Sequence, residues 1–401
     1  MTKFYCPAPW HMGYFTHAYQ SVCCAHPGEM LDSPLEYIKS QRIFQIKQGI
    51  ASGNLTPACQ QCKDNDDSGT YSTSQSHREL IQDLGIDTTN DPEVDTVPRA
   101  IEVRFSNLCN FKCRMCAPDW SSAIAKENSS HPELIQWYST DLQTRLDSGP
   151  KFLSGIMSIL PDLRQVYITG GEPTIQKSVL DFLDSMIDAK FSQNIRLNIT
   201  TNVSAVNPEL LNRLEKFSQV SIGLSLDAID RVAEYQRHGT IWSKIKSNVE
   251  TFGRFRLENP MRIHLAINSA LSAYTVLAVD DLVEYCLDIQ QRYRINPWKI
   301  FRVDRYLKPT VLVGIFRQRA IDSLGSAGAR LEKSKSSLQH SFYQHVYDQL
   351  HNLKHQLMTQ PPTDRWSDFV KLTRDLDAAR NENFAEIFGY ELDHPSTLVY
   401  Q

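Results

Sequence analysis

The sequence lacks the long apolar runs and the surplus of positive charge that mark several large classes of protein. No segment of the 401 residues approaches the roughly 20 consecutive apolar residues that a bilayer-spanning helix needs. Lys and Arg together number 42 against 46 Asp and Glu, which gives a formal net charge of -4. Nonspecific binding to a nucleic-acid backbone depends on a surplus of cations. We therefore expect neither a membrane protein nor a nonspecific nucleic-acid binder.

The N-terminus also lacks the basic start and apolar core of a secretory signal, so we expect a cytoplasmic protein. Nine cysteines is an odd number, which argues against a fully paired disulfide framework. In a reducing cytoplasm, clustered cysteines more often bind metal than form bridges. With 41% hydrophobic and 22% charged residues, the chain has the composition of one or two ordinary folded domains.

Six short β-rich runs alternate with helical patterns in the middle of the chain. The runs are 101–105, 165–169, 195–200, 220–226, 262–268 and 298–303. This alternation predicts an α/β fold with a parallel sheet covered by helices, and both doubly wound and barrel-like arrangements fit it. The clearest helical pattern is 276–293, whose apolar stripe includes Cys286. We expect Cys286 to be a buried thiol without a function.

The segments on either side of this α/β region differ from it, so we expect three parts. Residues 1–98 hold five cysteines and one good helix candidate, 34–49, and we expect bound metal to supply much of their order. Residues 99–310 form the α/β region. Residues 311–401 have mostly helical patterns, including one continuous helix over 366–388.

Three cysteines lie within eight residues directly after the first expected strand, namely Cys109, Cys113 and Cys116. Parallel α/β folds place their chemistry at this end of the strands. Three thiolates can bind three corners of a cubic iron-sulfur cluster, whose usual complement is four cysteines. One iron would then keep an open coordination position, as catalytic metal sites do. The alternatives are a zinc site completed by a distant histidine and a coincidence of buried thiols.

A second motif, Gly170-Gly171-Glu172-Pro173, follows the second expected strand. The two glycines allow a ligand to lie close against the backbone. Glu172 would place a carboxylate at the same edge of the sheet as the cysteines. Taken alone, this motif indicates only a turn.

Together, the two motifs resemble those of the radical S-adenosylmethionine (SAM) superfamily. The resemblance rests on the CxxxCxxC loop after strand one, the GGEP loop after strand two and the spacing of the later strands, and it covers about residues 99–305. It implies a partial (β/α)6 TIM-like barrel. It also implies that the three cysteines hold a [4Fe-4S] cluster whose fourth iron binds SAM. The glycine pair and Glu172 would then hold the methionine amino group.

The resemblance implies further SAM ligands among the polar residues that end the later strands. The serine and arginine expected at the SAM carboxylate are Ser225 and Arg237. The polar residues expected at the ribose are Asn202 and Asn268. Each of these residues also has an ordinary interpretation, as a strand residue or a solvated surface group.

The five N-terminal cysteines predict a second metal site. Cys59 and Cys62 form a CxxC pair, and Cys6, Cys23 and Cys24 lie upstream around an expected β-hairpin. Four such thiols suit either a [4Fe-4S] cluster or zinc. We favour all but Cys24 as ligands, with Cys24 as the alternate. The arrangement resembles the SPASM or twitch extension of radical SAM enzymes, which carries an auxiliary [4Fe-4S] cluster but usually follows the barrel. A zinc knuckle is the alternative.

The resemblance implies an enzyme that reductively cleaves SAM to give a 5′-deoxyadenosyl radical, which abstracts hydrogen from a substrate. The expected substrate is a peptide or protein side chain. The alternatives are modification of RNA or a nucleoside, and a non-catalytic metal-binding scaffold protein. A flavodoxin- or ferredoxin-type protein is the expected reductant.

Overall fold

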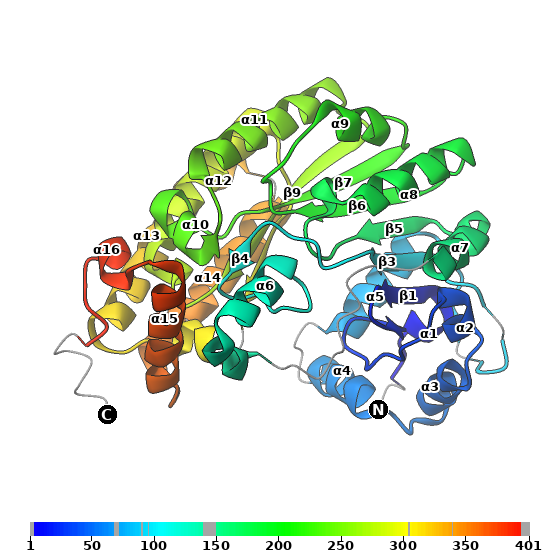
Figure 1. Ribbon diagram of the computed structural model, residues 1–401, viewed down its shortest axis with the longest axis horizontal. Coiled ribbons are helices and arrows are strands. Elements are labelled where there is room, and N and C mark those ends of the chain that lie inside the picture. Colours follow the sequence, from blue (N-terminus) through cyan, green and yellow to red (C-terminus); the bar gives the residue numbers. More distant parts are fainter. Residues whose placement is uncertain are drawn as a thin grey trace. The chain divides into compact units, whose positions relative to one another are not determined.

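The protein is an α/β structure whose strands are mostly parallel (Figure 1). The computed structural model describes residues 4–67, 72–89, 91–94, 96–138, 150–303, 305–338 and 340–393. The chain divides into two compact units, the first of Met1–Asn107, Leu142–Ile199 and Asn212–Val220, and the second of Leu108–Asp141, Thr200–Leu211 and Ser221–Gln401. Among the described residues, no helix combines the length and apolar character that crossing a membrane requires.

All six predicted β-rich runs form strands. They are β3 (Ala100–Arg104), β5 (Gln165–Ile168), β6 (Arg196–Thr201), β7 (Gln219–Ser225), β9 (Ile263–Leu271) and β10 (Trp298–Arg302). Strand β3 pairs in parallel with β5, β5 with β6, and β9 with β10. The predicted α/β class with a parallel sheet is confirmed, and it is consistent with a partial TIM-like fold.

The first unit extends this sheet with two N-terminal strands, β1 (Met12–Thr16) and β2 (Gln20–Ser21). They form the expected antiparallel hairpin, but β1 also pairs in parallel with β3, with Met12 opposite Ala100. The strand order in this unit is β2-β1-β3-β5-β6. The N-terminal segment is therefore part of the sheet, which the sequence analysis did not predict.

The helices of the first unit are more numerous than the sequence analysis expected. They are α1 (Ala8–His11), α2 (Pro34–Ile38), α3 (Gln41–Ser52), α4 (Pro57–Asp67), α5 (Thr73–Asp83), α7 (Pro150–Ile159) and α8 (Lys177–Asp188), with the 3-10 turns η2 (Leu160–Asp162) and η3 (Pro173–Ile175). The single helix expected over 34–49 is wrong. Ser33 and Ser40 each cap a separate helix by accepting a backbone N–H, so the chain starts a new helix at Gln41.

The second unit carries the strand order β6-β7-β9-β10 and most of the long helices. Its other elements are β4 (Lys112–Cys113), α6 (Ser122–Ser130), η1 (Pro132–Trp137), α10 (Asp230–Gln236), β8 (Arg237–His238), α11 (Trp242–Glu258), η4 (Thr275–Ala278), α12 (Val279–Tyr293), η5 (Arg305–Leu307), η6 (Pro309–Val311), α13 (Gly314–Ser334), η7 (Lys335–Ser337), α14 (His340–Thr359), α15 (Trp366–Arg380) and α16 (Phe384–Phe388). Helix α9 (Pro208–Leu214) is divided between the two units.

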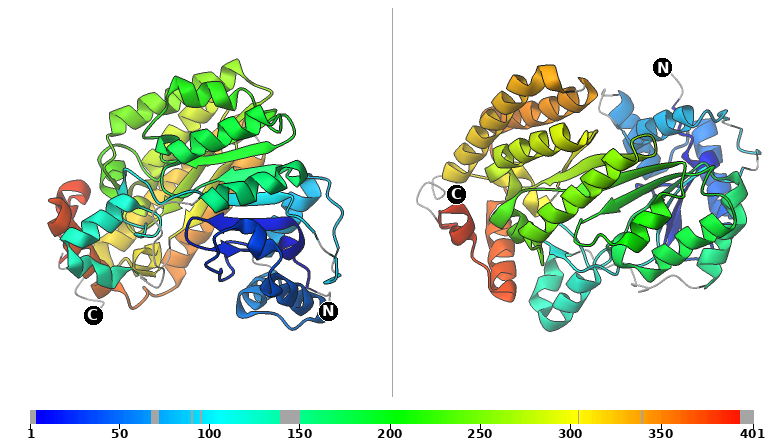
Figure 2. Two further views of the ribbon diagram at one scale, coloured as in Figure 1. Left: turned by 45° about the vertical axis from the view of Figure 1, so that its right-hand side comes forward. Right: turned by 90° about the horizontal axis from the view of Figure 1, so that it is seen from above.

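The helices of the second unit pack in successive layers. Helix α11 contacts β9 and α12, α13 packs on α12, and α14 lies beside α13 (Figure 2). Cys286 lies on α12 with 0% of its surface exposed. The continuous helix expected over 366–388 is wrong, because Asn381 adopts a left-handed conformation with φ of 52° and ends α15.

Candidate functional site

The three-cysteine loop is shaped by hydrogen bonds within the second unit. Its central residues form β4, which pairs with β8 so that Cys113 lies opposite Arg237. The backbone N–H of Cys109 donates to Ser122 Oγ at 3.2 Å, and that of Cys116 donates to the carbonyl of Cys113 at 3.0 Å. These bonds hold the three cysteines on one compact loop.

Nitrogen donors lie close to two of the three sulfur atoms. Arg237 Nη1 is 3.8 Å from Cys113 Sγ, and Asn202 Nδ2 is 3.9 Å from Cys109 Sγ. Burial raises the pKa of the Cys113 thiol to about 12, although the charge of Arg237 opposes this effect. A cation and an amide N–H beside these sulfurs stabilise thiolates, which is the form that binds iron. The donor set therefore fits a thiolate-bound cluster.

None of the nine cysteines forms a disulfide. Within the described ranges, no three His, Cys, Asp or Glu side chains converge on the position of a single metal ion. A cubic iron-sulfur cluster makes a different demand from a single ion, because each cysteine binds a separate iron atom.

Three of the predicted SAM ligands line one small cavity in the second unit, with a volume of about 10 Å³ that has room for about one water molecule. Asn202, Ser225 and Arg237 share its wall with Asp227. Arg237 Nε donates to Asp227 Oδ2 at 2.6 Å, and Asp227 Oδ1 accepts the backbone N–H of Ala270 at 2.7 Å. The buried Asp227 thus fixes the guanidinium in place. Asp227 was not among the site residues expected from the sequence.

Asn268 has a different position from the other three predicted ligands. It lies on β9, where its carbonyl accepts the N–H of Leu226 at 2.9 Å. A Cβ atom placed on Gly223 would be 2.4 Å from Asn268 Nδ2, so the amide packs directly over that glycine. Asn268 is not among the residues that line the cavity.

The Gly170-Gly171-Glu172 loop belongs to the first unit and forms a tight turn. Both glycines have positive φ angles, 83° and 53°. Glu172 is fully buried and caps η3, because its Oε1 accepts both the N–H of Thr174 at 3.1 Å and the Thr174 hydroxyl at 2.7 Å. The role of this loop in holding the methionine amino group stays a prediction.

Replacing Gly170 by alanine is expected to lower the free energy of unfolding by about 3 kcal/mol, because a left-handed backbone and a crowded Cβ act together. The new Cβ would lie 2.8 Å from Arg104 Cβ. The control is Gly53→Ala, which has nearly the same φ of 84° but no atom within 4 Å of its Cβ, and we expect it to cost about 1 kcal/mol. Urea unfolding measures the free energy of unfolding of both variants. Equal losses of stability would contradict the crowding argument.

All five N-terminal cysteines lie in the first unit, and several of them influence one another's pKa values. Cys59 and Cys62 lie on α4, one turn apart. Burial raises the pKa of Cys6 to about 12, and the charges of Cys59 and Cys62 add to this effect. Burial also raises the pKa of Cys23, and the neighbouring thiols of Cys24 and Cys6 raise it further. The pKa values of Cys6 and Cys23 therefore both respond to other N-terminal thiols.

His77 is an additional neighbour of this group that the sequence analysis did not single out. Its Nδ1 lies 3.9 Å from Cys6 Sγ, and burial lowers its pKa to about 4. A neutral imidazole is a common metal ligand. No local pattern marks this residue, because α5 brings it to Cys6 from 71 positions away.

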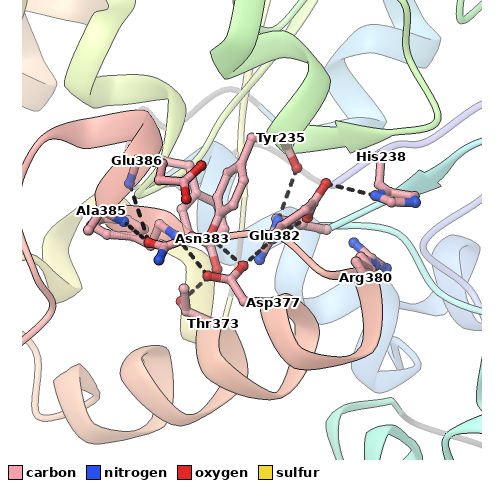
Figure 3. A network of polar contacts seen from close by, with 12 residues as sticks. Tyr235, His238, Thr373, Asp377, Arg380, Glu382, Asn383, Ala385 and Glu386 are labelled. Atoms are coloured by element: carbon pink, nitrogen blue, oxygen red, sulfur yellow. Dashed lines mark hydrogen bonds and ion pairs between the residues drawn. The ribbon is translucent and has the colours of Figure 1, made fainter.

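The cysteine loop is also tied to the C-terminal helices through Arg114. This side chain has 0% exposure, and its Nη2 donates to both Asp377 Oδ1 and Glu382 Oε2 at 2.5 Å. Its guanidinium carbon lies 3.5 Å from the centre of the Tyr235 ring. Figure 3 shows the carboxylates of Asp377 and Glu382 at the centre of this network, with Tyr235 and His238 directed toward them.

A second buried ion pair joins the same two parts of the unit. Arg380 of α15 makes a bidentate contact with Glu127 of α6, with bonds of 3.0 and 2.7 Å. Glu127 also pairs with Lys112 of the cysteine loop at 2.8 Å. The C-terminal helices therefore hold the loop by two separate sets of charges.

Comparisons with known proteins find similarity to radical SAM proteins over part of the chain. Residues 103–267 match the family model described as "Radical SAM superfamily". A GTP 3′,8-cyclase from Campylobacter lari is 31% identical over 144 residues, which cover 34% of this chain and 38% of that protein. A GTP 3′,8-cyclase from Corynebacterium glutamicum is 22% identical over 195 residues, which cover 48% and 46%.

The chain spans less than half the length of these two curated relatives. Among solved structures, one described as native anSMEcpe with bound AdoMet aligns with a TM-score of 0.41 and 15% identity, covering 59% of this chain and 61% of that chain.

Proposed function

This chain carries a radical SAM domain, and from that premise we propose that it cleaves SAM reductively and activates a second substrate by hydrogen abstraction. The observation that carries the proposal is the surroundings of the three-cysteine loop. Arg237 and Asn202 lie against the sulfurs of Cys113 and Cys109, and both residues also line the adjacent cavity.

The two motif loops and four residues that line that cavity each have a proposed task. When bound by the three cysteines, the [4Fe-4S] cluster supplies the electron that breaks a carbon-sulfur bond of SAM. Arg237, held by Asp227, orients the SAM carboxylate together with the Ser225 hydroxyl. Asn202 orients the ribose. The Gly170-Gly171-Glu172 loop holds the methionine amino group.

The test is SAM binding and cleavage by the full chain, reconstituted with iron and sulfide without oxygen. We expect 5′-deoxyadenosine to form in the presence of a strong reductant. Arg237→Gln is expected to weaken SAM binding about tenfold, because it removes a charge-assisted hydrogen bond. If the iron-loaded chain neither binds nor cleaves SAM, the scaffold alternative replaces the enzyme.

Two substrate classes are proposed. The cysteine-rich N-terminal region, which resembles the SPASM or twitch extension, supports a peptide or protein side chain. The curated relatives, named GTP 3′,8-cyclase, support a nucleotide. A flavodoxin- or ferredoxin-type protein is the proposed electron donor in either case.

We propose that the N-terminal cysteines hold an auxiliary [4Fe-4S] cluster. The reconstituted chain is then expected to contain about eight irons, and Cys59→Ala about four, because one of two four-iron clusters is lost. Iron and zinc analysis measures this. Comparing Cys23→Ala with Cys24→Ala identifies which adjacent thiol is a ligand, since only the ligand's loss lowers the iron content. One zinc with about four irons in the wild-type chain would replace the cluster with the zinc knuckle.

A further inference from the structure

A second cavity of the second unit borders the cysteine loop at Cys116. Its volume is about 320 Å³, within the usual range for small-molecule sites. Its walls are Arg114 to Ala117, Asp119, Trp120, Trp137, Tyr138, Val303, Arg305 to Leu307 and Leu372. It shares no residue with the cavity lined by Asn202, Ser225 and Arg237, whose residues contact Cys109 and Cys113 instead.

We propose that the cavity at Cys116 binds a mononucleotide as the second substrate, with its base against the aromatic wall and its phosphates toward the cationic side chains. This inference rests on the proposed function and names its substrate class. The work is then divided, because Asn202, Ser225 and Arg237 bind SAM beside Cys109 and Cys113, and the larger cavity binds the molecule to be modified beside Cys116.

The aromatic wall is held in a fixed arrangement. The rings of Trp137 and Tyr306 meet edge to face, with centres 5.2 Å apart and planes at 81°. Trp137 Nε1 donates to Asp375 Oδ2 at 2.9 Å, and Lys371 Nζ lies 4.7 Å from the Trp137 ring centre. Trp120 adds a third ring to the lining. Rigid rings of this kind present flat surfaces on which a nucleobase stacks.

Two buried polar atoms of lining residues have no hydrogen-bond partner in the described part of the chain. They are the hydroxyl of Tyr138 and Nη1 of Arg114. Buried donors are rarely left unpaired, because an unpaired polar group costs free energy. Arg114 is completely buried and already uses its other nitrogens. Neither unpaired atom has surface open to the cavity, so a bound ligand reaches them only if the side chains that cover them move.

Two further charged side chains of the lining also have no partner within the described residues, Asp119 and Arg305. Arg305 adopts a left-handed backbone with φ of 58°, a strain that in folded proteins clusters at functional sites. A guanidinium suits a phosphate, and a carboxylate suits the amino group of a base. Arg305 is exposed, so water solvates its charge in the absence of a ligand. A guanidinium and a carboxylate beside aromatic rings still offer a nucleotide more partners than they offer an aliphatic side chain.

The test is calorimetric titration of the reconstituted full chain with GTP, ATP, guanosine and a short unmodified peptide, in the presence of saturating SAM. We expect at least one nucleotide to bind. Arg305→Gln should weaken the binding of that nucleotide at least tenfold. It should leave the affinity for guanosine unchanged, because only the phosphates contact the guanidinium. Trp137→Leu should weaken the binding of the nucleotide and of guanosine, because both stack a base on this ring. Arg254→Gln, at an exposed arginine of α11 outside the cavity lining, is the matched control and should change neither affinity.

Three results would overturn the inference. SAM that competes with the nucleotide would assign the cavity to the adenosine part of SAM. Binding of the peptide but of no nucleotide would assign it to a polypeptide substrate. Absence of all binding would leave the cavity without a ligand. If the chain still cleaves SAM in the absence of substrate, each of these results rejects only the nucleotide site. If the chain cleaves no SAM, the proposed function itself is rejected.

Discussion

Replacing Cys113 by alanine is expected to abolish SAM cleavage and to remove about four irons from the reconstituted chain, because a cluster that loses one of three thiolates is not retained. Cys113 is the most constrained of the three. It is buried, pairs with Arg237 across the β4–β8 ladder and lies 3.8 Å from the guanidinium. The measurements are 5′-deoxyadenosine production and iron content after anaerobic reconstitution.

The matched control for this prediction is Cys286→Ala. Cys286 is a completely buried cysteine of the same unit, but it belongs to the apolar face of α12. We expect this variant to keep its iron and its SAM cleavage, with a modest loss of stability from the small cavity that forms. Undiminished cleavage by Cys113→Ala would reject the cluster assignment, as would equal losses in the two variants.

Replacing Arg114 by methionine is expected to lower the free energy of unfolding by about 3–5 kcal/mol, because two carboxylates would lose their buried cation. Asp377 and Glu382 both bind this one guanidinium. Since Arg114 lies between two cysteines of the loop, iron loading should also fall. Denaturant unfolding and iron analysis measure the two effects.

The control is Arg365→Met, which breaks an exposed ion pair with Asp368 and should cost less than about 1 kcal/mol. Adding Asp377→Asn and Glu382→Gln to Arg114→Met should recover part of the stability, since the unpaired charges are then removed. If Arg114→Met costs no more than the exposed control, the C-terminal helices do not hold the loop.

The same network predicts how stability changes with pH. Burial acts to raise the pKa of Glu382, but the hydrogen bond from His238 and the charge of Arg114 hold it below its usual value. A carboxylate with a depressed pKa stabilises the folded state above its unfolded pKa, and this contribution is lost as the pH falls through the folded value. Its protonation therefore weakens the hold on the cysteine loop at acid pH.

The sequence by itself determined the α/β core, because each strand carries a local period-two or fully apolar pattern and each long helix a stripe that repeats every three to four residues. Local spacing also placed Cys109, Cys113 and Cys116 on one loop. The short N-terminal helices were missed because their serine caps, such as Ser40, carry little weight without a long apolar stripe.

Only the tertiary structure decided which distant side chains meet. Asn202 and Ser225 share a cavity because they lie at the ends of β6 and β7, which are neighbours in the sheet, so sequence order allowed that expectation. Arg237 reaches the same cavity from β8, which pairs with β4 of the cysteine loop. The contact of Arg114 with Asp377 spans 263 positions. Such a contact leaves no local pattern, because the energy of a buried ion pair depends on distance and on exclusion of water, which packing alone establishes.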